Sequence, residues 1–267
     1  MSNNFKNIMK LVSPNNNTIP IKNTIKDIYN RPYNNKNVNE CNFEIPANIF
    51  QTWHSKQIPP LMMKSMLSIK RNNSRFNYYL FDDNDCANFI RNNFDEDVLN
   101  TYNNLIPGAY KADLWRYCIL YKLGGIYMDI KYKPINGFKL YNLLEKEHLV
   151  LDIDNNGIYN AVMVCKPGNE ILLRAIQKIC ENVKNKNYGT NMFEPTGPYL
   201  LGTFFTQEEK NNFDMKHVLY GNNDYEKVVQ YNGENILNCY PGYFEERAKY
   251  MNKQHYGELW KNKNIYL

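Results

Sequence analysis

The stretch KADLWRYCILYKLGGIYMDIKY, residues 111–132, joins a helix to a strand and decides the fold. Its first half is apolar on almost every side, which is typical of a buried helix. Lys122 in the last turn and Gly124 just beyond it predict that the helix ends there. Large apolar residues then alternate with polar ones from Ile126 to Tyr132, which predicts a strand. A buried helix followed directly by a strand favours an α/β domain.

The predicted strand carries an acid and a base on one face. Alternation places Tyr127, Asp129, Lys131 and Lys133 on the same side, with Asp129 and Lys131 about 6–7 Å apart at the backbone. Ligands of open α/β sheets gather at the carboxyl ends of strands. The two residues are therefore either a surface ion pair of little energetic value or part of a binding site.

A second pair of charges lies on the helix. Asp113 and Arg116 are three residues apart, so they share one face. Burying both is costly unless they pair with each other or bind a ligand. One interpretation is an ion pair that locks the helix. The other is a polar cleft that holds the hydroxyls of a ligand, in which Arg116 also suits a phosphate or orients Asp129.

The rest of the chain predicts one α/β domain over residues 44–267, preceded by a polar, Asn-rich N-terminal extension over residues 1–43. Strands are expected at 49–53 and 78–81, and a helix follows the proline pair at 59–60. Asp83 or Asn84 is expected to cap the next helix. The turn Asn155–Gly157 separates two strand-like runs, which predicts a hairpin.

Composition limits the classes of function. The chain has 267 residues, 43% of them hydrophobic, and a formal net charge of +5. Its lysines are scattered among acids, as on a solvated surface or in a mildly positive cleft for a phosphate, and no basic stripe suggests nucleic-acid binding. The six cysteines form no CxxC or zinc spacing, so we expect reduced thiols and an intracellular protein. No signal peptide or 18-residue apolar run is evident.

Five segments resemble glycosyltransferase family 32 in their order and spacing: IPANIFQTWHS, YLFDDND, KADLWRYCILYKLGGIYMDIKY, NAVMVCKPGNEILLRAI and PTGPYLL. The resemblance covers about residues 44–204, with a weaker match at 255–260. The ADLWRY…GGIYMD block is the specific one. The resemblance implies a GT-A fold, in which a Rossmann-like mixed sheet is flanked by helices. It also implies a retaining hexosyltransferase that moves a sugar from a UDP- or GDP-linked donor to a glycan or protein-glycan acceptor.

The same resemblance assigns roles to residues of the first half of the domain. Thr52 and Trp53 match the place where the nucleotide base packs, although Trp53 also suits the core. Asp113 and Arg116 match the pair that contacts the donor sugar and ribose. Asp129 matches the first acid of the family's Asp-x-Asp motif.

Residues of the second half are assigned in the same way. Asn160 matches an asparagine near the donor sugar, and Thr196-Gly197-Pro198 matches an acceptor-side loop that could equally be a simple turn. His255 and Trp260 match a C-terminal segment that closes over the diphosphate. A lone histidine in a polar tail is also compatible with a solvated surface residue.

The chain departs from the motif at Lys131, where the family has the acid that binds a divalent ion. An ammonium cannot bind Mg²⁺ or Mn²⁺, which prefer oxygen ligands. Three alternatives follow. In the first, Lys131 itself stabilises the leaving diphosphate without a metal. In the second, Mn²⁺ or Mg²⁺ binds through Asp129, the diphosphate and a C-terminal group such as His255 or Glu258. In the third, the chain has lost activity and only binds its ligand.

A catalytically weak protein that binds nucleotide sugars or glycans is therefore the alternative to a transferase. The base, the sugar, the acceptor and the oligomeric state are not indicated by the sequence. Secretory-pathway relatives carry a membrane anchor, and none is evident here. We therefore expect a cytoplasmic protein, in a bacterium or, if viral, in the host cytoplasm.

Overall fold

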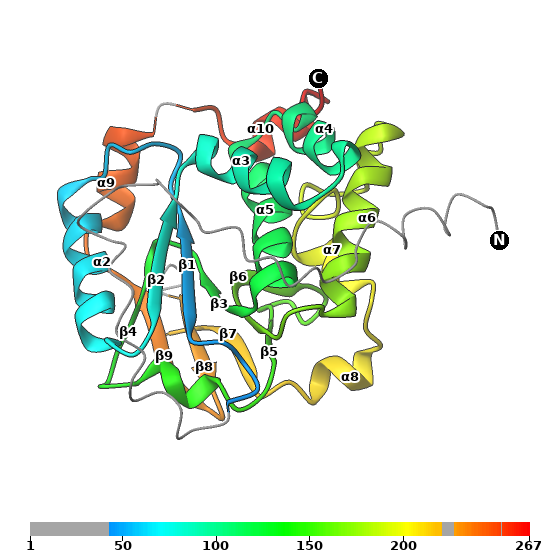
Figure 1. The fold of residues 1–267 in the computed structure, drawn as a ribbon. Coiled ribbons are helices and arrows are strands. Elements are labelled where there is room, and N and C mark those ends of the chain that lie inside the picture. The colour runs from blue at the N-terminus through cyan, green and yellow to red at the C-terminus, as the bar shows by residue number, and fades with distance from the viewer. Residues whose placement is uncertain (1–42, 221–226, 252) are drawn as a thin grey trace.

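The structure is a computed structural model that describes residues 43–220, 227–251 and 253–267. The predicted N-terminal extension, apart from Phe43, lies outside the described residues. Figure 1 shows the described strands at the centre, with α2 and α9 on one side and α3, α4, α5 and α6 on the other. The predicted α/β class, a mixed sheet flanked by helices, is confirmed.

The elements have the following bounds. The strands are β1 (Asn48–Thr52), β2 (Asn77–Phe81), β3 (Gly125–Met128), β4 (Tyr132–Pro134), β5 (His148–Leu151), β6 (Ile158–Cys165), β7 (Met215–Leu219), β8 (Lys227–Tyr231) and β9 (Glu234–Cys239). The longer helices are α2 (Pro60–Asn72), α3 (Asp83–Asn93), α4 (Glu96–Asn104), α5 (Gly108–Leu123), α6 (Glu170–Lys184) and α9 (Tyr243–Tyr250). The short ones are η1 (Leu140–Leu143), α7 (Pro198–Gly202), α8 (Gln207–Asn211) and α10 (Tyr256–Lys261).

The nine described strands form one sheet in the order β2-β1-β3-β6-β5-β7-β8-β9-β4. β2, β1 and β3 are mutually parallel, and β6 runs antiparallel to both β3 and β5. β7 pairs parallel with β5, and β8, β9 and β4 continue antiparallel. The strands β1, β3, β5 and β7 therefore end at the same edge of the sheet.

The sheet curls back on itself near its centre. β3 occupies a middle position and β4 lies at the far end of the strand order, yet only residues 129–131 connect them. Three residues span roughly 10 Å at most, so the edge strand β4 must return to the end of β3. The residues that carry the predicted acid and base thus lie where the curled sheet closes.

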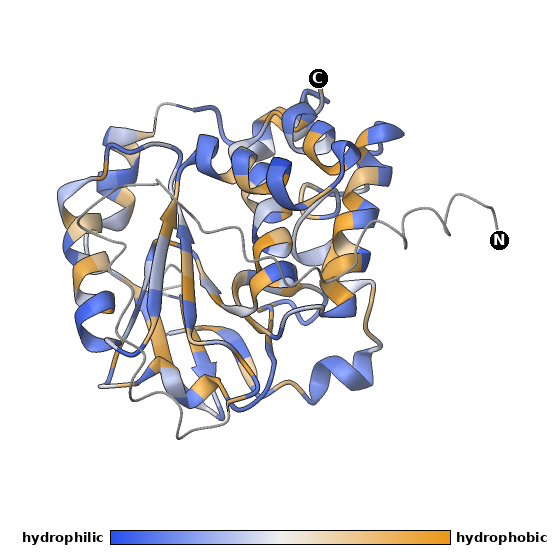
Figure 2. Cartoon of the chain, viewed as in Figure 1, coloured by the Kyte–Doolittle hydropathy of each residue, from blue (hydrophilic) through white to orange (hydrophobic). Residues whose placement is uncertain are grey.

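Two hydrophobic cores lie on opposite faces of the sheet. One packs α3, α4, α5 and α6 against residues such as Phe50, Tyr127 and Met163. The other packs α2 and η1 against residues such as Ile126 and Val162. In Figure 2, α5 and α6 both carry hydrophobic segments, whereas α8 is hydrophilic throughout. No helix of the described residues is long and apolar enough to cross a membrane.

The helix-to-strand junction forms as the sequence predicts. Gly124 ends α5 with φ of 60° and donates its N–H to Leu120 O at 2.9 Å. Gly125 follows with φ of 125°. Because both glycines adopt left-handed backbone angles, the chain reverses within two residues and β3 lies beside α5.

The predicted continuous strand over 126–132 is wrong. β3 ends at Met128, and Asp129 O accepts a hydrogen bond from Tyr132 N at 2.9 Å, so residues 129–132 form a turn. The turn is needed because β4 pairs with β9 at the far edge instead of continuing in line with β3. Alternation therefore does not decide where the side chains of Asp129 and Lys131 point.

Two other local predictions had different outcomes. The hairpin around Asn155–Gly157 is confirmed, because β5 and β6 pair antiparallel. The cap of α3 is neither Asp83 nor Asn84 but Asp82, whose carboxylate accepts Asp85 N at 2.8 Å. The Asp85 carboxylate in turn accepts a hydrogen bond from Asp82 N, which completes a capping box.

A glutamate of α9 caps α2 from outside the helix. The carboxylate of Glu246 is buried and accepts Leu61 N at 2.6 Å and Met62 N at 2.9 Å. Pro59, which precedes α2, offers no side-chain cap. The first turn of α2 therefore depends on a residue 185 positions away for the hydrogen bond to Leu61.

Replacing Glu246 with alanine is expected to lower the free energy of unfolding by about 1–3 kcal/mol, because two N–H groups lose their acceptor. Urea denaturation measures this change. Glu245→Ala, at an exposed neighbour on the same helix, is the control and should stay within about 0.5 kcal/mol of the wild type. Equal effects of the two variants would contradict the capping role.

Candidate active site

Four charged side chains alternate in sign across the gap between α5 and the β3–β4 turn. Arg116 Nη2 lies 3.3 Å from Asp113 Oδ1 and 3.5 Å from Asp129 Oδ1. Lys131 Nζ lies 3.1 Å from Asp129 Oδ2. The two pairs that the sequence singled out separately are therefore one chain of charges, Asp113–Arg116–Asp129–Lys131, which we call the charge cluster. Its formal net charge is zero.

The geometry of the junction explains why the two pairs meet. Arg116 lies eight residues before Gly124, about 12 Å along a helix. Asp129 lies five residues after Gly124, about 16 Å along a strand. Because the chain reverses at the glycines, both residues reach a similar height, and the long Arg116 side chain spans the remaining gap.

Asp113 is the buried end of the charge cluster. Its Oδ1 accepts Asn160 Nδ2 at 2.9 Å and its Oδ2 accepts Thr196 Oγ1 at 2.7 Å. Burial raises the pKa of Asp113, while Arg116, Thr196 and Asn160 oppose the rise. With donors on both oxygens, the carboxylate form fits this site. The structure thus brings together Asp113, Asn160 and Thr196, three residues that the sequence analysis singled out separately.

Arg116 is held in place by contacts additional to its ion pairs with Asp113 and Asp129. Its Nη1 donates to Asn160 O at 2.7 Å and its Nε donates to Ala112 O at 3.2 Å. The guanidinium carbon lies 4.5 Å from the centre of the Tyr127 ring. Burial opposes the charge, but Tyr127, Asp129 and Asp113 raise the pKa of Arg116, so it stays protonated. Only about 5% of the residue is exposed.

Asp129 accepts hydrogen bonds and ion pairs on both oxygens. Its Oδ1 contacts Arg116 and also accepts a hydrogen bond from the Tyr127 hydroxyl at 2.9 Å, and its Oδ2 forms the ion pair with Lys131. Burial alone would raise the pKa of Asp129, but Lys131 and Arg116 outweigh it and lower the pKa below the ordinary value. The Gln51 amide donates to Asp129 O at 3.3 Å, which ties the turn to β1. The carboxylate is therefore charged and held in one place at neutral pH.

Lys131 lies with Asp129 at the half-buried end of the charge cluster. Burial would lower its pKa, but Asp129 reverses the effect and raises it, so the ammonium persists at neutral pH. Its Nζ lies 5.2 Å from the centre of the Tyr132 ring and 5.6 Å from that of Tyr159. With 21% of its side chain exposed, Lys131 is reachable from solvent.

Sequence reasoning missed Gln51, Tyr127 and Tyr159, which complete the surroundings of the charge cluster. Tyr127 precedes Asp129 by two residues and was expected only to share its face. Tyr159 lies next to Asn160 at the start of β6, so its position was available from the predicted hairpin. Gln51 gave no signal, because a glutamine within a short apolar strand has no chemistry of its own.

Thr52 and Trp53 lie at the carboxyl end of β1 but contact other parts of the chain. Thr52 Oγ1 donates to Phe81 O at 2.8 Å, and Trp53 Nε1 donates to Gln57 O at 3.2 Å. Trp53 is only 4% exposed and belongs to the core on the α2 side. Their part in binding a nucleotide base stays a prediction.

The predicted acceptor-side loop lies against Asp113. Thr196 is fully buried, and a Cβ on Gly197 would come 3.5 Å from Asp113 Oδ2. Pro198 begins α7, where its missing N–H is not needed. The loop therefore supports the charge cluster, and its role toward an acceptor stays a prediction.

The C-terminal pair lies on α10. His255 Nδ1 accepts Gly257 N at 3.1 Å, and Trp260 Nε1 donates to Tyr188 O at 2.7 Å. Among the described residues, no ion pair or hydrogen bond joins either of them to the charge cluster. Burial raises the pKa of their neighbour Tyr256, and the charge of Asp113 adds to the rise. Closure of this segment over a diphosphate stays a prediction.

The contacts of Asp129 bear on whether a divalent cation could bind there. Both oxygens of Asp129 are engaged by Arg116, Tyr127 and Lys131. Within the described ranges, no group of three or more His, Cys, Asp or Glu side chains could hold a metal ion. Glu258 lies near Lys261, with 3.6 Å between the charged atoms. A metal at Asp129 would therefore have to displace Lys131 or Arg116 from the carboxylate oxygens.

The chain matches known sugar transferases in sequence. A family model described as "Glycosyltransferase sugar-binding region containing DXD motif" matches residues 59–149, which include all four residues of the charge cluster. Inositol phosphoceramide mannosyltransferase 3 of Schizosaccharomyces pombe is 29% identical over 70% of this chain and 51% of its own length. An uncharacterised glycosyltransferase of Acanthamoeba polyphaga mimivirus is 28% identical over 63% of this chain and 67% of its own.

Two more distant matches were also found. The initiation-specific alpha-1,6-mannosyltransferase of Candida albicans is 27% identical over 49% of this chain and 34% of its own length. The solved structure of PaToxG glycosyltransferase aligns with 61% of this chain and 69% of its own at 16% identity, with a TM-score of 0.48. The chain spans about half the length of the first of these relatives.

The resemblance to glycosyltransferase family 32 is confirmed by the family model and by the named relatives. The family model is described by a DXD motif within the matched region. The assignment of Asp129 to the first acid of that motif, with Lys131 in place of the second, stays a prediction from the sequence.

Proposed function

We propose that the protein is a retaining hexosyltransferase that uses a nucleotide-diphosphate sugar, linked to UDP or GDP, and transfers the sugar to a hydroxyl of a glycan acceptor. The observation that carries the proposal is the charge cluster at the carboxyl edge of β3, inside the region that matches the sugar-transferase model. The named mannosyltransferases among the relatives support this class of reaction.

The chemistry needs a positive charge where the donor breaks. When the bond between the sugar and the diphosphate cleaves, negative charge develops on the departing phosphate oxygen. Lys131 has three N–H donors and uses one on Asp129, which leaves two for phosphate oxygens. Arg116 and Tyr127 hold Asp129, so the ammonium of Lys131 is aimed before the donor arrives.

Asp113 acts through its neighbours. It fixes Arg116, Asn160 and Thr196 by direct contacts, and Arg116 in turn contacts Asp129. Groups held in this way need no reorganisation when the donor binds. We therefore propose a positioning role for Asp113 and direct contact with the diphosphate for Lys131.

We also propose that turnover does not require Mn²⁺ or Mg²⁺. The support is the donor set at Asp129, which is already engaged by cations and a hydroxyl. Activity should then survive an excess of EDTA. Loss of activity in EDTA, with recovery on adding Mn²⁺, would contradict this part of the proposal.

The test is a panel of UDP- and GDP-linked hexoses, read as release of the free nucleotide diphosphate. Asp113→Ala should lower kcat/KM at least about 10²-fold with the productive donor, because Arg116, Asn160 and Thr196 lose their common partner. Asp113→Asn keeps the shape if the alanine variant is unstable, and Asp97→Ala, at an exposed acid of α4, is the control.

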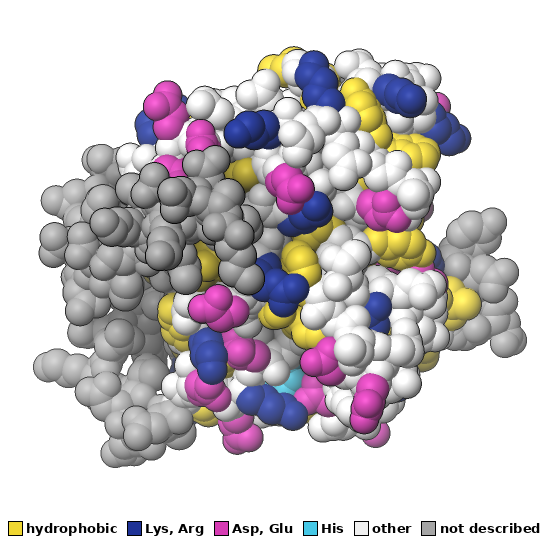
Figure 3. All heavy atoms as spheres, turned by 90° about the vertical axis from the view of Figure 1, so that its right-hand side faces the viewer, with side chains coloured by type: hydrophobic (Ala, Val, Ile, Leu, Met, Phe, Trp, Pro, Cys, Tyr) yellow, Lys and Arg dark blue, Asp and Glu magenta, His cyan; other side chains and the backbone are white. Residues whose placement is uncertain are grey.

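One alternative has an observation in its favour. Lys131 in place of the second acid also suits a protein that binds nucleotide sugars without turning them over. Tight donor binding by calorimetry, together with no nucleotide release from any donor, would support that alternative. Nucleic-acid binding has no such support, because acidic and basic side chains are interspersed on the face shown in Figure 3.

A further inference from the structure

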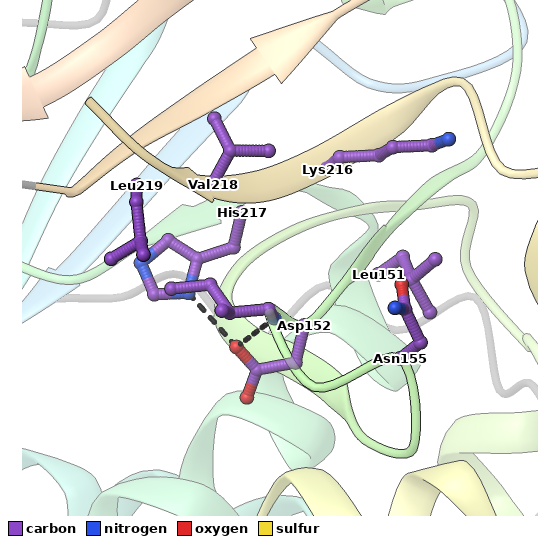
Figure 4. Close-up of a pocket in the computed structure, with 8 residues that line it drawn as sticks. Leu151, Asp152, Asn155, Lys216, His217, Val218 and Leu219 are labelled. Atoms are coloured by element: carbon purple, nitrogen blue, oxygen red, sulfur yellow. Dashed lines mark hydrogen bonds and ion pairs between the residues drawn. The ribbon is translucent and has the colours of Figure 1, made fainter. Parts of the chain in front are cut away.

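A cavity of about 240 Å³ lies between the end of β5 and strand β7 (Figure 4). It is lined by Leu151, Asp152, Ile153 and Asn155 on one side and by residues 216–219 on the other. Pockets for drug-sized ligands hold about 300–1,000 Å³. The cavity is therefore of a size for one small ring and not for an extended chain.

The cavity opens at the same edge of the sheet as Asp129. β5 runs parallel to β3, because β6 is antiparallel to both, and β7 is parallel to β5. Asp152 follows the last residue of β5 just as Asp129 follows the last residue of β3. Ligands of open α/β sheets collect at this edge, so the two acids face a common region.

Asp152 is paired with a histidine of β7. His217 Nδ1 lies 2.9 Å from Asp152 Oδ1, and the Ile153 N–H donates to the same oxygen at 2.8 Å. The His217 ring stacks on Tyr159 with 3.7 Å between centroids. Tyr159 is the ring that lies near Lys131. A continuous row of contacts thus leads from the charge cluster to the cavity.

Two polar atoms of this pair are unused. Among the described residues, Asp152 Oδ2 has no hydrogen-bond partner, and Figure 4 shows it pointing away from the His217 ring. His217 is 6% exposed, and its Nε2 is buried without a partner in the described part of the chain. In Figure 4 this nitrogen lies on the side of Leu219, which also lines the cavity. Burying a polar atom without a partner is unfavourable.

The protonation of the pair suits a hydrogen-bond acceptor. Burial lowers the pKa of His217, and Asp152 opposes the change only in part. A neutral imidazole that donates from Nδ1 to Asp152 presents a lone pair at Nε2. The carboxylate and the imidazole then both accept hydrogen bonds, and hydroxyl groups are the neutral ligands that supply such donors.

We propose that this cavity binds one polyhydroxylated ring of the acceptor, with Asp152 and His217 accepting hydrogen bonds from its hydroxyls. The inference rests on the proposed sugar transfer and adds where the acceptor lies. A ring held between the 152–157 loop and β7 would present a further hydroxyl toward Lys131 and Asp129. His217 also positions Asp152, since the two share a hydrogen bond.

The chain contains a matched control for this pair. His148 at the start of β5 pairs with Asp214 just before β7, with 2.9 Å between His148 Nδ1 and Asp214 Oδ1. Both pairs join the same two parallel strands, but this one lies at the opposite edge of the sheet. If His–Asp pairs only hold β5 to β7, variants of the two should have the same effects.

The experiment measures binding of simple sugars directly. Methyl glycosides of mannose, glucose and galactose, together with myo-inositol, are tested by saturation-transfer NMR on the full chain with UDP or GDP present. His217→Asn keeps a donor near Asp152 and removes Nε2, and Asp152→Asn removes the charge. Each should weaken binding of the sugar that the wild type binds by at least about tenfold, whereas His148→Asn and Asp214→Asn should not.

The outcomes separate this inference from the proposed function. The inference is overturned if the wild type binds none of these probes, or if variants of both His–Asp pairs lose binding alike. If no donor releases nucleotide but sugar binding still depends on His217, the transferase proposal fails and the cavity assignment stands. In an active enzyme, His217→Asn should raise the KM for acceptor and leave the KM for donor unchanged.

Discussion

Lys131→Ala is expected to lower kcat by about 10²–10³-fold, the effect of removing one donor that stabilises developing negative charge. The loss should fall on kcat more than on donor KM, because the charge on the phosphate oxygen grows as the bond breaks. Asp129 keeps Arg116 and Tyr127 as partners in this variant. Steady-state kinetics with the productive nucleotide sugar, in EDTA, measures the change.

Two further variants test whether the loss of activity is due to the missing charge at position 131. Lys131→Arg keeps a cation at the position and should recover part of the activity. Lys133→Ala removes the next lysine along the chain, in β4, which is half-buried and forms no ion pair with the charge cluster among the described residues. This variant should leave kcat within about twofold. If Lys131→Ala retains wild-type kcat, Lys131 has no role toward the diphosphate.

Gly124→Ala is expected to destabilise the protein by roughly 2–6 kcal/mol, which is a large share of the usual 5–15 kcal/mol. Two separate effects add. The residue has φ of 60°, and a Cβ there would lie 2.5 Å from Pro167 Cδ and 2.8 Å from Pro167 N. Crowding against a proline ring and backbone cannot be relieved by a rotamer change. Urea denaturation followed by circular dichroism measures the loss.

A substitution at Gly168 separates the cost of the positive backbone angle from the cost of crowding against a neighbour. It has φ of 75°, but a Cβ there would meet nothing within 4 Å. Gly168→Ala should therefore show the cost of the backbone angle alone, about 1 kcal/mol. If Gly124→Ala costs no more than Gly168→Ala, the close approach of Pro167 does not constrain the junction.

Much of the fold could be predicted from the sequence because the signals were local. The apolar helix, its glycine stop and the hairpin at Asn155–Gly157 each follow from a few neighbouring residues. The closeness of Asp113 to Arg116 follows from helix periodicity. The contact between Arg116 and Asp129 could also be derived from the sequence. It requires a comparison of how far each residue lies from the chain reversal at Gly124, along the helix and along the strand.

What could not be predicted depends on contacts between distant segments. A continuous strand through Asp129 is the natural interpretation of IYMDIKY, and it fails because β4 pairs with β9. No local pattern reveals that pairing. His217 and Asp152 escaped notice for the same reason, since β5 and β7 are separated in sequence by β6, α6, α7 and α8. The sequence did contain one indication that Asp152 belongs to a site, because Asp152 follows a short apolar strand just as Asp129 does.

The closure of the sheet at residues 129–131 has a consequence for the order of folding. β4 pairs with β9, roughly a hundred residues later in the chain. Such non-local pairing forms slowly, so the lysine and the acid beside it reach their final positions only after the C-terminal strands have docked. A nascent or half-folded chain should therefore not capture nucleotide sugar. A donor that binds only the finished site adds its binding energy to the last step of assembly.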